Sequence, residues 1–471
     1  MVDPLIKETR SALELLLVET EQEIARLLQV AIQTKTSINR HSLTSSLPPE
    51  ILSEIFVLCC QPNYNAIGGV DRQGICPLRL SAVCKAWREL AWTTSRLWSV
   101  IILIFPNPHA LHLEEIFASW IERAGNQPLS IRYDIRGNGL LDRLIRPQDT
   151  LKWKNVSIFI PSESLPVIKK YDYFPLLEHL SIRVRAASSD KYDLENFDIF
   201  NPFSLPSITR LHVPQYLRRF KHNSMWLQLR TFSASTIGHE QLWDILFSAE
   251  FLEVFNANSL EPHSKGNIPE TVNHSYLRRL VLKEVDSGTL NLLLSTPGIS
   301  TPNLEDLTIE ISYGSPDSTS LSNFITSLHQ LRRFKVKYDD HHDPEWFFHW
   351  LLNIPSLTEL HVETSTRAIT NIVSALGNPA STETKMEYLP LLVDLTITGF
   401  FWGSNFMVKD IPEMLAYRSS GLSPSISRLK RAFIHQKSRP FSNEDLEAFR
   451  TASLGDLAFT VVDSWNGAHR I

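Results

Sequence analysis

Apolar residues recur through most of this chain as apolar-x-x-apolar-x-apolar triplets. The nine occurrences are Leu177/Leu180/Ile182, Ile208/Leu211/Val213, Leu229/Phe232/Ala234, Leu252/Phe255/Ala257, Leu277/Leu280/Leu282, Leu304/Leu307/Ile309, Leu331/Phe334/Val336, Leu357/Leu360/Val362 and Leu392/Leu395/Ile397. Their first positions lie 31, 21, 23, 25, 27, 27, 26 and 35 residues apart. Most of these steps fall in or close to the range of about 20 to 29 residues that is typical of one class of strand-and-helix repeat.

The last two positions of each triplet are two residues apart, so they point to the same side of a strand and into a core. Segments between triplets, Trp346 to Leu352 and Thr370 to Leu376 among them, carry helical apolar spacing. Alternating strands and helices predict an α/β fold, a curved solenoid with a parallel sheet. The Asn that normally closes each turn of such a repeat is mostly absent, so we expect an irregular array, with a less regular α/β stack as the alternative.

Both ends of the array have their own signals, and we place it at residues 100–465. A strand at Val100 to Phe105, a helix within His112 to Tyr133 and a strand at Leu129 to Ile131 predict an atypical first unit. At the other end, Ser442-Asn443-Glu444-Asp445 is a capping-box-like helix start, and a strand-like segment follows at Leu457 to Val462. These last elements predict a C-terminal cap.

The segment from Pro4 to Asn39 has no internal Pro or Gly, and it predicts a long helix within residues 1–41. Leu17, Ile24, Ala31 and Ile38 follow heptad spacing, but Thr20 and Thr34 interrupt the second seam position. A helix that packs on its own protein or pairs weakly is therefore favoured over a strong dimeric coiled coil. The polar stretch from His41 to Ser46 predicts a linker.

Residues 42–99 carry a motif in two halves. The first is Leu47-Pro48-Pro49-Glu50-Ile51-Leu52-Ser53-Glu54-Ile55-Phe56, which predicts a short helix with its prolines at the start. The second is Val83-Cys84-Lys85-Ala86-Trp87-Arg88, followed by Leu97-Trp98. Together they resemble the F-box-like domain of fungal proteins. An insertion from Cys59 to Pro77 departs from that pattern, since a shorter link is usual there.

The resemblance implies three packed helices that insert into the Skp-type adaptor of a cullin-RING (SCF-type) ubiquitin ligase. Apolar and aromatic anchors suit such a contact. The candidate adaptor-binding residues are Leu47, Pro48, Ile51, Leu52, Ile55, Val83, Cys84, Trp87 and Trp98. The alternative is that they only form the core of a helical hairpin. Residues from about 126 to 465 resemble the leucine-rich repeats of substrate-receptor F-box proteins.

Composition narrows the function classes. The net charge of −5 supplies no bulk attraction to nucleic acid or to an anionic membrane surface. Four cysteines in 471 residues suit a reducing compartment, and the chain begins without a secretory signal or a membrane-length apolar run. We therefore expect a cytosolic or nuclear protein that binds neither nucleic acid nor membrane.

Catalytic and metal-binding motifs are missing from the sequence: there is no phosphate-binding loop, no His-Glu-x-x-His, no Gly-x-Ser-x-Gly and no Cys-x-x-Cys. The cluster from Asp339 to Asp343 is better explained as a polar loop entering a helix than as a metal site. His109 and His112 lack an acidic or thiol partner nearby. Cys59, Cys60, Cys76 and Cys84 match no common zinc spacing. We expect no catalytic residue, no metal and no cofactor.

These features predict a non-catalytic substrate receptor, whose F-box binds the adaptor and whose solenoid binds a protein substrate. Outward strand residues would form a concave recognition face. Its candidate substrate-binding residues, Lys283, Glu310, Lys337 and Glu363, alternate in charge. The same four fit equally well as ordinary solvated residues. A leucine-rich-repeat scaffold acting outside any ligase, and an enzyme hidden in the irregular repeats, are the other hypotheses.

Overall fold

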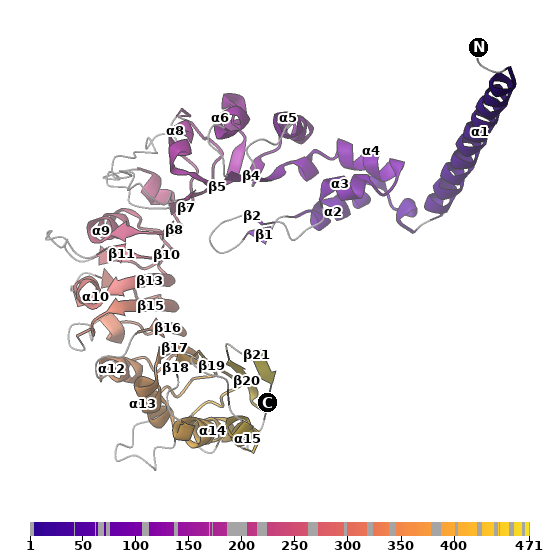
Figure 1. Ribbon diagram of the computed structural model, residues 1–471. Helices are drawn as coiled ribbons and strands as arrows, with labels where there is room; N and C mark the ends of the chain where they lie inside the picture. The colour runs from indigo at the N-terminus through magenta and orange to yellow at the C-terminus, as the bar shows by residue number, and fades with distance from the viewer. Residues whose placement is uncertain are drawn as a thin grey trace.

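The structure of this chain is a computed structural model. It describes residues 4–41, 43–61, 63–64, 70–71, 76–105, 113–135, 140–168, 170–171, 173–185, 205–213, 224–261, 272–295, 299–317, 324–338, 345–377, 388–400, 404–421, 426–437, 441, 443–451, 456–463 and 467–470. Over these residues the protein is a mixed α/β fold with helices at its N-terminal end and one large, mainly parallel sheet (Figure 1). The expected α/β class is confirmed.

The predicted N-terminal helix is present as α1, Pro4–Arg40. Every described side chain from Thr9 to Asn39 is exposed, including Leu17 and Ile24 on the heptad seam. Packing of this helix along its own protein is therefore not found among the described residues. Only its last turns approach the next segment, where Ile32 and Asn39 line a shared pocket.

Short helices follow α1, and two of them begin with a proline in the first turn. The 3₁₀ turn η1 (Leu43–Ser46) precedes α2 (Pro49–Cys59), which has proline in its first turn, where no backbone donor is lost. Helix α3 (Pro77–Ser81) starts in the same way. Helix α4 (Lys85–Thr93) leads to the 3₁₀ turn η2 (Ser95–Trp98). Within the Cys59 to Pro77 insertion, β1 (Asn63–Tyr64) and β2 (Val70–Asp71) pair antiparallel, and β2 lies against the sheet at β4.

The large sheet has fifteen strands whose spatial order follows their order in the chain. The strands are β3 (Val100–Phe105), β4 (Leu129–Ile135), β5 (Trp153–Pro161), β6 (His179–Arg185), β7 (Arg210–Val213), β8 (Thr231–Ala234), β10 (Val254–Ala257), β13 (Arg279–Asp286), β15 (Asp306–Tyr313), β16 (Arg333–Lys337), β17 (Glu359–Ser365), β18 (Asp394–Phe400), β19 (Arg431–Gln436), β20 (Ala458–Asp463) and β21 (Gly467–Arg470). All neighbours pair parallel except β20 and β21, which are antiparallel. The expectation of a parallel sheet is thus correct up to its last strand. Two small parallel ladders stand apart: β9 (Ile237–Gly238) with β11 (Leu260–Glu261), and β12 (Val272–Asn273) with β14 (Ile299–Ser300).

Helices connect the strands and lie on the outer side of the curved sheet (Figure 1). They are α5 (Leu113–Ala124), α6 (Leu140–Leu144), α7 (Pro147–Thr150), α8 (Leu165–Ile168), α9 (His239–Ser248), α10 (Ser287–Ser295), α12 (Glu345–Asn353), α13 (Thr366–Leu376), α14 (Ser404–Ser420) and α15 (Asn443–Thr451), with 3₁₀ turns η3 (Ser162–Ser164) and η6 (Ser224–Gln228). Parallel strands require such crossover connections. The strands therefore line the inner, concave side.

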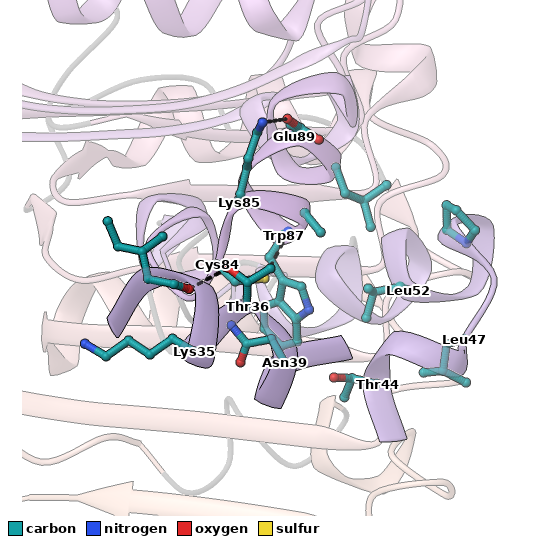
Figure 2. A pocket seen from close by; sticks show the side chains of 14 residues that line it. Lys35, Thr36, Asn39, Thr44, Leu47, Leu52, Cys84, Lys85, Trp87 and Glu89 are labelled. Carbon is teal, nitrogen blue, oxygen red and sulfur yellow. Dashed lines mark hydrogen bonds and ion pairs between the residues drawn. The ribbon is translucent and has the colours of Figure 1, made fainter. Parts of the chain in front are cut away.

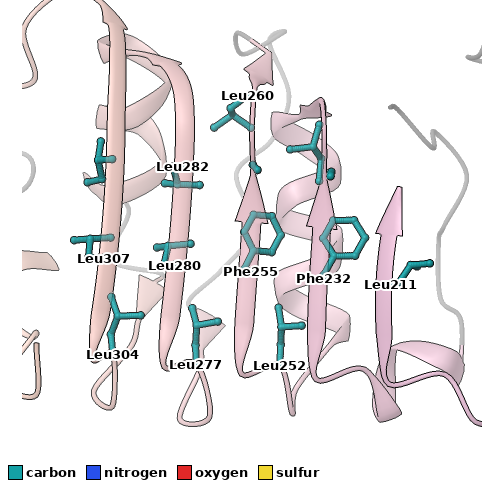
Figure 3. Packing of buried hydrophobic residues seen from close by; sticks show 14 of the residues in the cluster. Leu211, Phe232, Leu252, Phe255, Leu260, Leu277, Leu280, Leu282, Leu304 and Leu307 are labelled. Carbon is teal, nitrogen blue, oxygen red and sulfur yellow. The ribbon is translucent and has the colours of Figure 1, made fainter. Parts of the chain in front are cut away.

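The apolar triplets build the core between sheet and helices. Every side chain of the nine triplets is buried. Equivalent positions face one another across the strands, as Leu280, Leu307 and Phe334 do in register on β13, β15 and β16. Figure 3 shows this stacking for the part of the core from Leu211 to Leu307. The sequence period thus corresponds to one strand of the sheet per triplet.

The N-terminal helices join this core through aromatic contacts. Trp98 is fully buried, and its indole Nε1–H donates to the Ala91 carbonyl oxygen at 2.8 Å. Its ring meets that of Trp120 on α5 edge to face, with centroids 4.9 Å apart. The Arg123 guanidinium lies 4.7 Å from the Trp98 ring centroid. Buried side chains from Leu52 to Val461 belong to one apolar cluster.

Candidate partner-docking site

Helix α2 carries two neighbouring apolar rows, one buried and one exposed. Leu52 and Phe56, one turn apart, face the core and are buried. Ile51, Ile55 and Leu58 follow the same spacing on the outside, with 51%, 39% and 63% of their surfaces exposed. Leu47, just before the helix, is also exposed and continues the spacing. An exposed apolar row of this kind is typical of a surface that another protein covers.

Helix α4 packs against the buried side of α2. The Trp87 ring is half-buried and packs on Phe56, with ring centroids 4.7 Å apart. Cys84 is the N-cap of α4, and its sulfur accepts a hydrogen bond from the Trp87 backbone N–H at 3.5 Å. Val83, immediately before this cap, is exposed. The Val-Cys-x-x-Trp spacing therefore has a local structural reason: it starts the helix and places the indole against α2.

A pocket of about 730 Å³ lies where the end of α1 meets α2 and α4 (Figure 2). Leu47, Leu52 and Trp87 contribute apolar walls from the motif. Lys35, from the last turns of α1, places a positive charge at its edge. The motif gives no indication that α1 lines this pocket, because α1 and α2 are separated in the sequence by the polar stretch from His41 to Ser46.

The nine predicted adaptor-binding residues fall into three groups by exposure. Leu47, Pro48, Ile51, Ile55 and Val83 are exposed, Cys84 and Trp87 are half-buried, and Leu52 and Trp98 are buried. The five exposed residues can contact a partner without any rearrangement of the helices. Leu52 and Trp98 position the others, because one holds α2 on the core and the other holds the helices on the sheet.

Two exposed leucines of these helices were missed in the sequence. Leu58 continues the exposed row of α2 three residues after Ile55, and Leu78 is exposed on α3. The helical spacing from Ile51 through Ile55 extends to Leu58, so this residue could have been predicted. Leu78 follows the insertion and carries no comparable signal.

The four predicted substrate-binding residues lie together in one row on the inner side of the sheet. Lys283 Nζ is 3.4 Å from a Glu310 carboxylate oxygen, and Lys337 Nζ is 3.1 Å from one of Glu363. Glu310 and Lys337 are themselves in register on β15 and β16. The four charges therefore neutralise one another across four strands.

Lys437 adds a third cation to this row and a second one beside Glu363, with its Nζ 2.7 Å from that carboxylate. Burial opposes ionisation of Glu363, but hydrogen bonds from Lys437 and Lys337 outweigh it and lower the carboxyl pKa. The hydrogen bond to Glu363 likewise raises the pKa of the Lys337 ammonium. Both groups are held in their charged forms.

Within the described ranges, no group of three or more His, Cys, Asp or Glu side chains is arranged to hold a metal ion. The four cysteines form no disulfide and are half-buried. The Asp339 to Asp343 cluster, His109 and His112 lie outside the described residues. A separate survey of the described helices finds none that is both long and apolar enough to cross a bilayer.

Neither a scan against protein-family models nor a search of curated proteins matches this chain. The functional argument therefore depends on its own residues and their geometry.

Proposed function

We propose that this protein is a substrate-receptor subunit of a cullin-RING (SCF-type) ubiquitin ligase, located in the cytosol or nucleus. In this proposal α2, α3 and α4 form an F-box-like domain that binds a Skp-type adaptor. The curved sheet with its outer helices is an array of leucine-rich-repeat type that binds the protein substrate.

The observation that carries the proposal is the exposed apolar row Leu47, Ile51, Ile55 and Leu58 on α2. Leu52 and Phe56 already anchor that helix in the core, so packing within the fold does not explain why the outer row is apolar. Replacing water around these side chains with an apolar groove is worth roughly 25 cal/mol per Å² of buried surface. The residues lie within the stretch that resembles an F-box.

The proposed mechanism involves no bond chemistry in this chain. The receptor holds a substrate near the ligase's catalytic partners, which raises the effective concentration of the reacting groups. Such a role benefits from a firm connection between the two binding surfaces. The Trp98 and Trp120 contact supplies one, since it packs η2 directly against α5.

The experiment is co-purification of the full chain with a Skp-type adaptor. The informative variant is Ile51→Asp/Ile55→Asp, because both side chains are exposed and their replacement leaves the core intact. Substitutions at Leu52 or Trp87 are less useful, since these residues also hold the helices together. The matched control is Leu391→Asp, an equally exposed leucine distant from α2.

We expect a stable complex with the unmodified chain and with the control, and its loss in the double variant. The circular dichroism spectrum and melting temperature of the double variant should match those of the control. Failure of the unmodified chain to bind any Skp-type adaptor would contradict the proposal and favour the scaffold that acts outside a ligase.

A further inference from the structure

The concave side of the sheet over β4 to β7 differs from the rest of that side. Strand alternation places Leu180, Ile182 and Leu211 in the core, so Ser181 and His212 point to the concave side. Ser157 on β5 is in register with Ser181 on β6, and Ser181 with His212 on β7. Three polar side chains thus form one continuous row across three strands.

These three side chains are buried without hydrogen-bond partners. Ser157 and Ser181 have 1% of their surfaces exposed, and His212 has 4%. Neither serine hydroxyl oxygen and neither ring nitrogen of His212 makes a hydrogen bond within the described chain. A buried polar group without a partner costs about 1–3 kcal/mol, so native proteins rarely keep several side by side.

Arginines surround this row. Arg183 and Arg185 lie over the Phe159 ring, with guanidinium carbons 5.3 and 4.5 Å from its centroid. Arg132 on β4 is in register with Ser157 and so lies next to it at one end of the row. Arg210 is exposed on β7. The carboxylate of Asp134 is the acidic group here, 3.8 Å from Arg132 and 3.5 Å from Arg185. Among the described strand residues of β4 to β7, these four arginines and one aspartate leave an excess of positive charge.

The protonation states follow from the same geometry. Burial and the neighbouring charges of Arg183 and His179 lower the pKa of His212 to about 4. Burial, assisted by Arg132 and opposed by Asp134, also lowers the pKa of the Arg183 guanidinium, although arginine stays charged near neutral pH. His212 is therefore neutral at pH 7, with one ring nitrogen carrying a proton that it can donate.

Over β13 to β19 the arginines of the concave side have acidic partners, although the His361 Nε2 on β17 is also buried without a hydrogen-bond partner. Arg279 and Arg333 both reach Asp306, with nitrogen-to-oxygen distances of 2.9 and 3.2 Å. Arg431 and Asp394 form a two-point ion pair. These contacts provide Arg279, Arg333 and Arg431 with acidic neighbours, and the pairs described above do the same for Lys283, Lys337 and Lys437. Among the described strand residues, the excess of cations over acidic partners is larger over β4 to β7.

We propose that the concave face over β4 to β7 is a phosphoryl-binding site, in which Arg183, Ser181 and His212 hold the phosphoryl oxygens. The hydroxyls, the imidazole N–H and the guanidinium Nε–H supply donors from three adjacent strands. A phosphoryl group carries three terminal acceptor oxygens and up to two negative charges, and arginine matches it in both geometry and charge. A carboxylate offers two oxygens and one negative charge, so it matches this set of donors and arginines less well than a phosphoryl group does.

The site uses no residue of α2 to α4, so the inference goes beyond the proposed function and can be tested separately from it. The phosphoryl group could be carried by a phosphorylated side chain of a partner protein or by a small phosphate ester. The two sources share the recognition chemistry, and the probes below distinguish them.

The experiment uses the full chain with ¹³C-labelled histidine, and the His212 resonance is assigned from its absence in His212→Gln. Inorganic phosphate, N-acetyl-phosphoserine amide and N-acetyl-aspartate amide are titrated separately. We expect both phosphoryl compounds to shift the His212 resonance in a saturable manner, and the aspartate compound to act at least about tenfold more weakly. A response to inorganic phosphate alone supports the site with a small phosphate as its ligand.

Arg183→Gln should weaken phosphoryl binding at least about tenfold, as expected for loss of a charged hydrogen bond. Arg333→Gln is the matched control, because it removes the same charge from the same side of the sheet where Arg279 still neutralises Asp306. Ser181→Ala provides a second, milder variant if Arg183→Gln does not fold. Absence of binding, equal loss in Arg333→Gln, or equal binding of the aspartate compound would overturn the proposal.

Discussion

Trp98 and Trp120 meet edge to face with their ring centroids 4.9 Å apart, and this contact joins the N-terminal helices to the sheet. Trp98 also donates to the Ala91 carbonyl oxygen and is fully buried. The residue that closes the two-part motif thus belongs to the joint between the helices and the sheet.

Trp98→Ala should lower the free energy of unfolding by about 3–5 kcal/mol, because it leaves a large cavity in this joint. Urea unfolding followed by far-ultraviolet circular dichroism measures the change. Tyr313→Ala is the control, since that aromatic ring is mostly exposed and its removal should cost less than about 0.5 kcal/mol. Equal losses in both variants would contradict the role assigned to Trp98.

The two sides of α2 should respond differently to truncation. Phe56→Ala removes a buried ring that packs on Trp87, and we expect a loss of about 3–5 kcal/mol in unfolding free energy. Ile55→Ala, one residue away but exposed, should change stability by less than about 0.5 kcal/mol. A large loss in Ile55→Ala would show that the outer row is covered by the protein itself.

Arg418 stabilises the C-terminal part of the array as a buried donor. Its guanidinium donates to the carbonyl oxygens of Leu376 at 2.8 Å and Leu389 at 3.1 Å, and also to that of Tyr388. Arg418→Met keeps the aliphatic volume but leaves these acceptors without the guanidinium, so we expect a loss of about 3–5 kcal/mol. Chemical denaturation measures it, with Arg333→Met as the partly exposed control.

Acid should destabilise the fold through two buried histidines. Burial and the charge of Arg210 lower the pKa of His179 to about 4, and that of His212 is likewise about 4. In the unfolded chain both rings titrate near pH 6.5, so the unfolded state binds more protons between these values. Stability is therefore fully present above about pH 6.5 and falls as the pH approaches 4, by about 3 kcal/mol per histidine.

Urea unfolding at a series of pH values between 4 and 7 tests this expectation. The double variant His179→Gln/His212→Gln should show a flatter dependence of unfolding free energy on pH than the unmodified chain. Identical slopes for the two proteins would show that these rings do not remain neutral in the folded state.

Much of the fold could be predicted from the order of apolar residues. The triplets marked buried strand positions because an alternating strand must direct every second side chain into the core. The helix at Pro4–Arg40 followed from the absence of helix breakers, and the strand at Val100–Phe105 from its apolar run. The antiparallel pairing of β21 with β20 could not be predicted, since nothing in residues 467–470 distinguishes the two directions.

The candidate docking surface was predictable only in part. The motif identified α2, but Ile51 and Leu52 are adjacent apolar residues, and the sequence cannot say which of them faces the core. Packing of Phe56 on Trp87 settles the rotation of the helix, burying Leu52 and exposing Ile51. The pocket wall from α1 depends in the same way on tertiary contacts.

The sequence by itself determined the apolar period, the parallel array that it builds and the motif near the N-terminus, because these depend on short-range spacing. The tertiary structure decided which polar residues become neighbours. Ser157, Ser181 and His212 are more than twenty residues apart in the chain, and only strand register brings them together. The packing of neighbouring strands also brings Lys283 to Glu310 and leaves an excess of arginines over β4 to β7, which spacing along the chain does not encode.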